Sequence, residues 1–183
     1  MALKATIFKA QLGIADIDRP YYGDHTVTLA RHPSETDERM LVRLLAFALH
    51  AGDALEFGKG LSTDDEPDLW RRDLTGLIEL WIDVGLPDEK RVRKACGRAA
   101  EVFVYSYGGR GADLWWNQNA RSLERLRNLT VVNLRYGSTP SLADLATRNM
   151  DLRVTVQERQ IWVTDGAATV EIEPAVLTAP GRA

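Results

Sequence analysis

One stretch, EPDLWRRDLTGLIELWIDVG at residues 66–85, limits the fold more than any other. It predicts two strands joined by a tight turn near residues 73–76, and the second strand is almost wholly apolar. Such a composition is typical of a strand in the middle of a sheet. Residues 86–100 then predict a helix that starts near Pro87, and EVFVYSY at residues 101–107 predicts a further central strand in parallel pairing.

The rest of the chain predicts a mixed α+β fold. A helix is expected after Ser34, its candidate N-cap, because apolar residues recur at helical spacing from Met40 to Ala48. The other expected elements are strands at 5–14 and 25–31 with a long connection, a loop at 51–66, a helix at 111–128, a strand at 130–136, a short helix at 140–149, and two or three strands within 151–173. We therefore expect one α/β domain over residues 1–183, with a mixed central sheet flanked by helices, an N-terminal β-hairpin and C-terminal strands.

Composition excludes several classes of protein. With 45% hydrophobic residues, 27% charged residues and a net charge of −3, the chain is globular and has no overall basic field to attract nucleic acid or anionic lipid. The lone Cys96 excludes an internal disulfide and a multi-cysteine zinc site, and this usage is typical of a reducing cytoplasm. The run LVRLLAFALHAG is interrupted by Arg43 and is shorter than the roughly 20 residues that span a bilayer. We expect a cytoplasmic protein without a membrane partner.

Acidic residues in the 66–85 hairpin form a candidate metal site. Alternation along the second strand puts Glu79, Trp81 and Asp83 on one face. Asp68, on the first strand, is expected opposite residues 81–82, and diagonal neighbours across strands lie about 7–8 Å apart. Because two adjacent carboxylates repel each other, a cation between Asp68 and Asp83 would stabilise them. Mg²⁺ or Mn²⁺ is the natural choice, since hard divalent ions prefer oxygen ligands.

The helix at 86–100 supplies positive charge next to these acids. Lys90, Lys94 and Arg98 recur every four residues, with Arg91 beside them, so these four residues are candidates for binding nucleic acid. Carboxylates and a lysine around a metal are the groups that hydrolysis of a phosphodiester requires. A plainer interpretation stays open, in which the stripe is a solvated surface and Asp83 caps the following helix.

Several motifs together resemble the YaeQ family. They are ARHPSETDERML, DDEPDLW, ELWIDVGLPDEKRVRKAC and ADLWWNQN, and the resemblance covers essentially the whole chain. It implies a compact variant of the PD-(D/E)XK nuclease fold, with a restriction-endonuclease-like core. Pro67 and Asp68 match the Pro-Asp pair of that motif, and Asp83 matches its second acid. The lysine position holds Gly85, which departs from the pattern.

The same resemblance implies further site residues. In this superfamily the lysine can move to the neighbouring helix, so Lys94 is the first candidate and Lys90 the second. An additional acid often comes from the first core helix, where Glu38 matches, although an acid in a first helical turn also simply favours the helix dipole. Glu79 shares the face of Asp83 and could assist it.

Three functions follow as expectations. The first is a nuclease that depends on Mg²⁺ or Mn²⁺. The second is a catalytically inactive module on the same fold, which binds nucleic acid or a protein partner. The third is a metal-dependent hydrolase that acts on a small phosphate compound.

Overall fold

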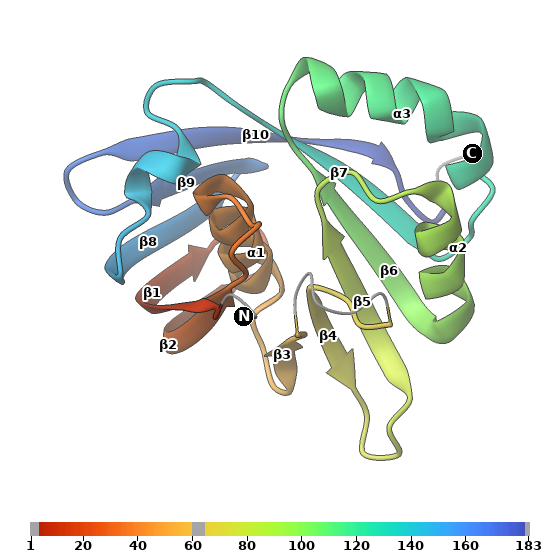
Figure 1. Cartoon of the computed structure of the whole chain (residues 1–183), viewed down its shortest axis with the longest axis horizontal. Coiled ribbons are helices and arrows are strands. Elements are labelled where there is room, and N and C mark those ends of the chain that lie inside the picture. The colour runs from red at the N-terminus through yellow and green to blue at the C-terminus, as the bar shows by residue number, and fades with distance from the viewer. Residues whose placement is uncertain (1–3, 60–64, 182–183) are drawn as a thin grey trace. The chain divides into compact units, whose positions relative to one another are not determined.

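The computed structural model describes residues 4–59 and 65–181 (Figure 1), and within these ranges the chain divides into two compact units. Unit 1 contains residues 4–51 and 136–174, and unit 2 contains residues 52–59, 65–135 and 175–181. The fold class is mixed α+β, with a large β-sheet component and three α-helices in the described ranges. None of these helices has the length and apolar character that crossing a membrane requires.

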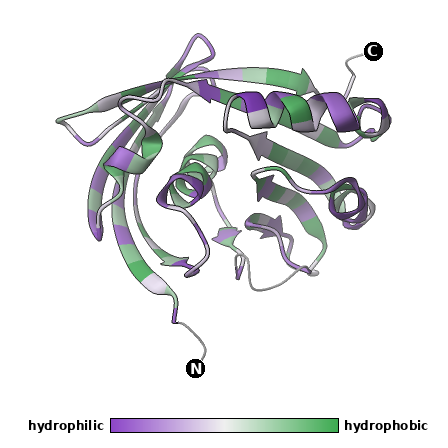
Figure 2. Cartoon of the chain, turned by 45° about the horizontal axis from the view of Figure 1, so that its top comes forward, coloured by the Kyte–Doolittle hydropathy of each residue, from purple (hydrophilic) through white to green (hydrophobic). Residues whose placement is uncertain are grey.

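Unit 1 is a strand-rich layer that packs on one helix. Its elements are β1 (Thr6–Asp16), β2 (Tyr21–Arg31), α1 (Asp37–His50), the short 3₁₀ helix η2 (Leu142–Leu145), β8 (Asn149–Gln157), β9 (Gln160–Thr164) and the first part of β10 (Thr169–Thr178). The strand order is β2-β1-β8-β9-β10, and only the β1–β8 pair is parallel. Hydrophobic and hydrophilic residues alternate along these strands (Figure 2), so one face is apolar.

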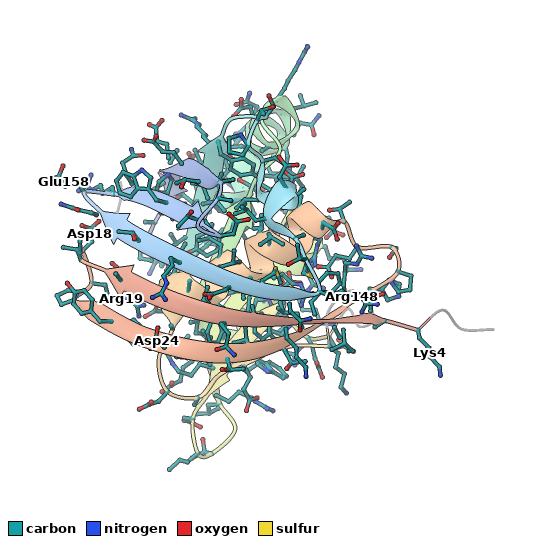
Figure 3. The ribbon with its side chains drawn as sticks, turned by 90° about the vertical axis from the view of Figure 1, so that its left-hand side faces the viewer. Lys4, Asp18, Arg19, Asp24, Arg148 and Glu158 are labelled. Atoms are coloured by element: carbon teal, nitrogen blue, oxygen red, sulfur yellow. The ribbon has the colours of Figure 1, made fainter. Side chains whose placement is uncertain are left out.

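Hydrogen bonds fix both ends of the parallel β1–β8 pair. At one end Asp18 accepts from the backbone N–H groups of Glu158 and Arg159, each at 2.8 Å, and Figure 3 shows Asp18 and Glu158 at the same end of the layer. At the other end Arg148 donates to the carbonyl of Ile7 at 2.9 Å. The β1–β2 connection is a short turn rather than the long connection predicted, because polar residues near the turn lie on the outer face of paired strands.

Helix α1 differs from prediction at its start and explains its internal arginine. Thr36, not Ser34, caps the helix by accepting from the N–H of Arg39 at 3.1 Å, whereas the Ser34 hydroxyl bonds His32. Arg43 is 2% exposed within the apolar helix. Its guanidinium donates to both carboxylate oxygens of buried Glu35, at 2.7 and 2.8 Å, so the buried charge is paired.

Unit 2 holds the predicted hairpin in a mixed sheet. Its elements are β3 (Leu55–Phe57), β4 (Leu69–Arg72), β5 (Ile78–Val84), α2 (Glu89–Arg98), β6 (Ala99–Ser106), α3 (Arg110–Leu123) and β7 (Leu129–Tyr136). The strand order is β7-β6-β5-β4-β3, with β5, β6 and β7 parallel to one another, which confirms the prediction of central parallel strands. Both α2 and α3 pack on the face of the sheet that carries Trp81, and together they enclose its apolar core.

Candidate functional site

The β4–β5 hairpin closes through a turn that Asp73 organises. One oxygen of its carboxylate accepts from the N–H groups of Thr75 and Leu77, at 2.8 and 3.0 Å, and from the Thr75 hydroxyl at 2.6 Å. The Thr75 hydroxyl contributes most to lowering the pKa of Asp73 below its usual 3.8. Gly76 supplies the left-handed residue of the turn, with φ of 88°. This turn lies where the sequence predicted it and holds the register of the strands.

That register brings Asp68 and Asp83 together at the far end of the hairpin. Leu69 pairs with Ile82, so Asp68 stands across from Asp83, one or two residues further along than predicted. The difference arises from a bulge at Arg71 and Arg72, which shifts the pairing. Both acids are buried, at 3% and 2% exposure. Asp68 accepts from the N–H of Val84 at 2.8 Å, which ties the two strand ends together.

Arg91 neutralises Asp83. Its Nε and Nη2 donate to the two carboxylate oxygens, both at 2.9 Å, and Nη2 also donates to the carbonyl of Glu66 at 3.0 Å. Helix α2 delivers Arg91 to this place because Asp88, not Asp83, caps the helix by accepting from the N–H of Arg91 at 2.8 Å. Two-point contact between a guanidinium and a carboxylate is among the strong hydrogen-bonded pairs in proteins. Arg91, expected to bind nucleic acid, thus faces an internal acid.

The other basic residues of α2 have different surroundings. Lys94 forms an ion pair with Asp65 at 2.5 Å, and this contact contributes most to lowering the pKa of Asp65. Arg98 donates to the carbonyl of Asp65 at 2.9 Å, and its guanidinium lies over the ring of Trp81. Lys90 is exposed to solvent. The structure therefore brings Lys94 and Arg98 to residue 65 rather than to Asp83.

The two remaining candidate acids lie elsewhere. Glu79 is exposed at the start of β5 and pairs with Arg71 at 3.1 Å. Glu38 belongs to unit 1, where its carboxylate accepts from the Tyr136 hydroxyl at 2.6 Å. The catalytic assignments of Glu38, Glu79 and Lys94 stay predictions, and these contacts give none of them a link to Asp68.

Backbone conformation accounts for the glycine in the lysine position. Strand β5 ends at Val84, and Gly85 adopts φ of 98°, a left-handed conformation that a lysine adopts only with strain. Space is open around this residue, since a Cβ built on it meets nothing within 4 Å. The glycine at the position where the resemblance predicts a lysine is therefore favoured by the local backbone conformation.

Buried polar residues that sequence reasoning missed lie beside this bend. Ser106, the last residue of β6, pairs with Asn133 inside β7, and the two are 0% and 2% exposed. The Ser106 hydroxyl donates to the Asn133 amide oxygen at 3.2 Å, and the Asn133 amide nitrogen donates to Asp113 at 3.4 Å. The one signal in the sequence is the asparagine inside the apolar run TVVNLRY. These contacts satisfy buried polar atoms at the end of β6 and in the middle of β7.

The acids of this site do not fit a divalent ion in their present arrangement. Both oxygens of Asp83 accept from Arg91, and one oxygen of Asp68 accepts from Val84. Within residues 4–59 and 65–181, no three or more His, Cys, Asp or Glu side chains gather in a way that could hold a metal. A divalent ion at Asp83 would have to share these oxygens with the positive guanidinium of Arg91, which opposes its binding.

Trp81, beneath α2, and Cys96, within α2, both contribute to the core. Trp81 is 1% exposed and packs with Val92 and Ala95 of the helix, so its ring is not available to stack on a base. Cys96 is half-buried against the same core, and burial raises the pKa of its thiol to about 11. A thiol in this state is a poor nucleophile.

Comparisons with known proteins agree along most of the chain. The family model described as "YaeQ protein" matches residues 1–174. "Uncharacterized protein YaeQ" of Salmonella typhi is 46% identical over 173 residues, covering 94% of this chain and 96% of that protein. The protein of the same name from Escherichia coli (strain K12) is 46% identical over 172 residues, covering 94% and 95%.

Solved structures give the same result. The crystal structure of YaeQ protein from Xanthomonas axonopodis pv. citri is 52% identical, with a TM-score of 0.91 over 96% of this chain and 99% of that chain. The crystal structure of YaeQ protein from Pseudomonas syringae is 34% identical, with a TM-score of 0.87 over 96% and 97%. The chain therefore belongs to the YaeQ family.

Proposed function

We propose that unit 2 is a nuclease-like core of the compact PD-(D/E)XK type that binds the phosphates of nucleic acid without hydrolysing them. The observation that carries this proposal is the pairing of Arg91 with both oxygens of Asp83. An internal guanidinium takes the place that a metal ion would need. Gly85, in the lysine position, also supports the absence of hydrolysis, because no basic side chain follows Asp83 along the strand.

The energetics of Asp83 favour a permanent partner. Its side chain is 2% exposed, whereas that of Arg91 is 25% exposed, so the acid depends on Arg91 for compensation of its charge. Separating such a pair leaves a buried carboxylate without compensation, which is strongly unfavourable. The free energy of binding a hydrated divalent ion would have to exceed the free energy lost when the Asp83–Arg91 pair separates. A structural role for the Asp83–Arg91 pair therefore needs fewer assumptions than a catalytic one.

Helix α2 supplies the binding surface of the proposal. With Arg91 turned inward, three of the four predicted binding residues remain for a partner, namely Lys90, Lys94 and Arg98. Lysine and arginine contacts to phosphates release counterions, so such binding weakens steeply as salt rises. The net charge of −3 confines this binding to the local patch.

Fluorescence anisotropy with labelled single-stranded and duplex oligonucleotides tests the proposal at several salt concentrations. We expect salt-dependent binding, no cleavage of either oligonucleotide in Mg²⁺ or Mn²⁺, and a large loss of affinity in K94E/R98E. The matched control is R121E/R125E, which reverses two exposed arginines in and just after α3. Binding that survives K94E/R98E unchanged would remove nucleic acid from the proposal and leave a protein partner.

A metal-dependent nuclease is the second candidate, and the burial of Asp68 and Asp83 side by side favours it. Calorimetric titration of Mn²⁺ into the wild type, R91Q and D68A/D83A separates the two candidates. Saturable binding by the wild type that disappears in D68A/D83A would support the nuclease. Binding by R91Q alone would show that Arg91 fills the place of the metal, as the first proposal states.

A further inference from the structure

Three cationic side chains of α2 reach the same two residues ahead of β4. Arg91 donates to the carbonyl of Glu66 at 3.0 Å, Lys94 pairs with the carboxylate of Asp65 at 2.5 Å, and Arg98 donates to the carbonyl of Asp65 at 2.9 Å. Residues 91, 94 and 98 are spaced by three and four, so they share one side of the helix. The segment Asp65–Glu66 thus lies along the basic side of α2.

The groups that this segment offers resemble those of a nucleic-acid backbone. Two carbonyl oxygens and one carboxylate accept hydrogen bonds from guanidinium and ammonium groups, as phosphate oxygens do. Asp65 is exposed and negative near neutral pH, and the Lys94 ammonium holds its pKa below the usual 3.8. The chain itself therefore places a negative group where a phosphate would bind.

The contact with Lys94 is of a kind that exchanges readily. The side chains of Lys94 and Asp65 are 51% and 77% exposed, and exposed ion pairs are weak and screened by salt. Arg91 differs, because it is anchored on buried Asp83. Lys94 and Arg98 are consequently the two cations that a competing anion could capture.

A second anchor allows Asp65 to leave α2 without disturbing the hairpin. Glu66 accepts from the backbone N–H of Lys59 at 3.1 Å, and its carboxylate lies 3.5 Å from the Lys59 ammonium. The segment is therefore also held from the side of β3, and the register of β4 with β5 does not depend on Asp65.

We propose that Asp65 is an internal competitor of nucleic-acid phosphates for Lys94 and Arg98, so that a bound strand displaces it from α2. This inference rests on the proposed function and adds regulation to the same surface. It predicts that removing the charge of Asp65 strengthens binding by more than the general change in net charge does.

Anisotropy titrations of a fluorescein-labelled oligo-dT at one fixed, low salt concentration test the competition. The variants are D65N, K94Q and D65N/K94Q, and the matched control is D53N. Asp53 is an exposed residue of the same unit with no ion pair among residues 4–59 and 65–181, and its replacement changes the net charge equally. Thermal midpoints of all variants verify folding.

We expect D65N to tighten binding about two- to fivefold, as removal of a weak ion pair allows, and D53N to change it much less. In the K94Q background, D65N should increase the affinity for the oligonucleotide by no more than D53N does, because the ammonium group that Asp65 competes for is gone. Equal effects of D65N and D53N on a protein that binds would overturn the competition and leave the proposed function standing. Absence of binding by both the wild type and D65N would overturn both.

Discussion

The guanidinium of Arg91 meets the carboxylate of Asp83 through two hydrogen bonds, each 2.9 Å long, and joins the end of β5 to the first turn of α2. This pair decides how the hairpin acids should be interpreted. Asp83 stands where the family resemblance predicts a metal ligand, but it is paired with an arginine, as a structural acid is. The two interpretations predict opposite consequences when the pair is broken, since a structural pair carries stability and a vacant metal site carries little.

Arg91→Gln should destabilise the protein by about 2–3 kcal/mol, because it leaves the buried carboxylate of Asp83 without a countercharge. Arg93→Gln on the same helix is the control. The Arg93–Glu89 pair is exposed, at 57% and 39%, so its loss should cost less than about 1 kcal/mol. Urea unfolding of both variants gives the comparison. Equal stabilities of the two variants would contradict a structural role for Arg91.

Gly58→Ala should destabilise the protein by about 2 kcal/mol or more through overpacking. A Cβ at residue 58 would lie 1.9 Å from the carbonyl oxygen of Pro67, and the Gly58 N–H already bonds the Asp68 carbonyl at 2.9 Å. Gly97→Ala is the matched control in α2, where a Cβ meets nothing within 4 Å. This control should gain up to about 1 kcal/mol from helix propensity. Urea unfolding distinguishes the expected loss of stability in Gly58→Ala from the expected gain in Gly97→Ala.

Asp73→Ala should lower the urea midpoint at pH 7 and have a smaller effect in acid. Hydrogen bonding by the Thr75 hydroxyl holds the pKa of Asp73 below 3.8 in the folded protein. A group with a lowered folded pKa stabilises the fold above its unfolded pKa, and this stabilisation disappears as pH falls through the folded value. The difference in urea midpoint between the wild type and the variant should therefore become smaller below pH 3.8. Asp53→Ala, with no such turn to hold, should show no comparable gap at pH 7, and a constant gap for Asp73→Ala would contradict the prediction.

The thiol of Cys96 should react slowly with a disulfide reagent at pH 8. Because burial raises its pKa to about 11, very little thiolate is present at this pH. An unperturbed thiol has a pKa near 8.5, so the folded protein should react about a hundredfold more slowly than the urea-unfolded chain. Release of the coloured thiol product measures both rates. Similar rates in the two states would show that α2 does not shield the residue.

Local pattern was enough to predict most elements but not the partners of their side chains. The turn near Asp73 and the parallel strand at residues 101–107 follow from composition and periodicity, and both are present. Strand β3 was missed because it has only three residues. It is stabilised by pairing with β4, more than ten residues later in the chain, and a local sequence pattern does not show this pairing. The long β1–β2 connection was wrong because its polar residues alternate on an exposed face.

In the candidate site, too, the sequence predicted which elements meet but not which side chains pair. Sequence placed Asp68 and Asp83 near each other, and the structure does so. A spacing of four grouped Lys90, Lys94 and Arg98, whereas the cation that meets Asp83 is Arg91. Which side of a helix faces the sheet depends on where the helix begins, and here that is set by the Asp88 cap. The spacing of charged residues alone does not determine which of them faces the sheet.

Arg98 has one further consequence. Its guanidinium carbon lies 5.3 Å from the centre of the Trp81 ring, while its Nη1 holds the carbonyl of Asp65. A positive charge at this distance shifts the energy of the excited indole, so emission from Trp81 depends on where Arg98 rests. Among the five tryptophans, Trp81 therefore reports on the residue 65 region, and a molecule that draws Arg98 away should shift the emission wavelength of this residue without an added dye.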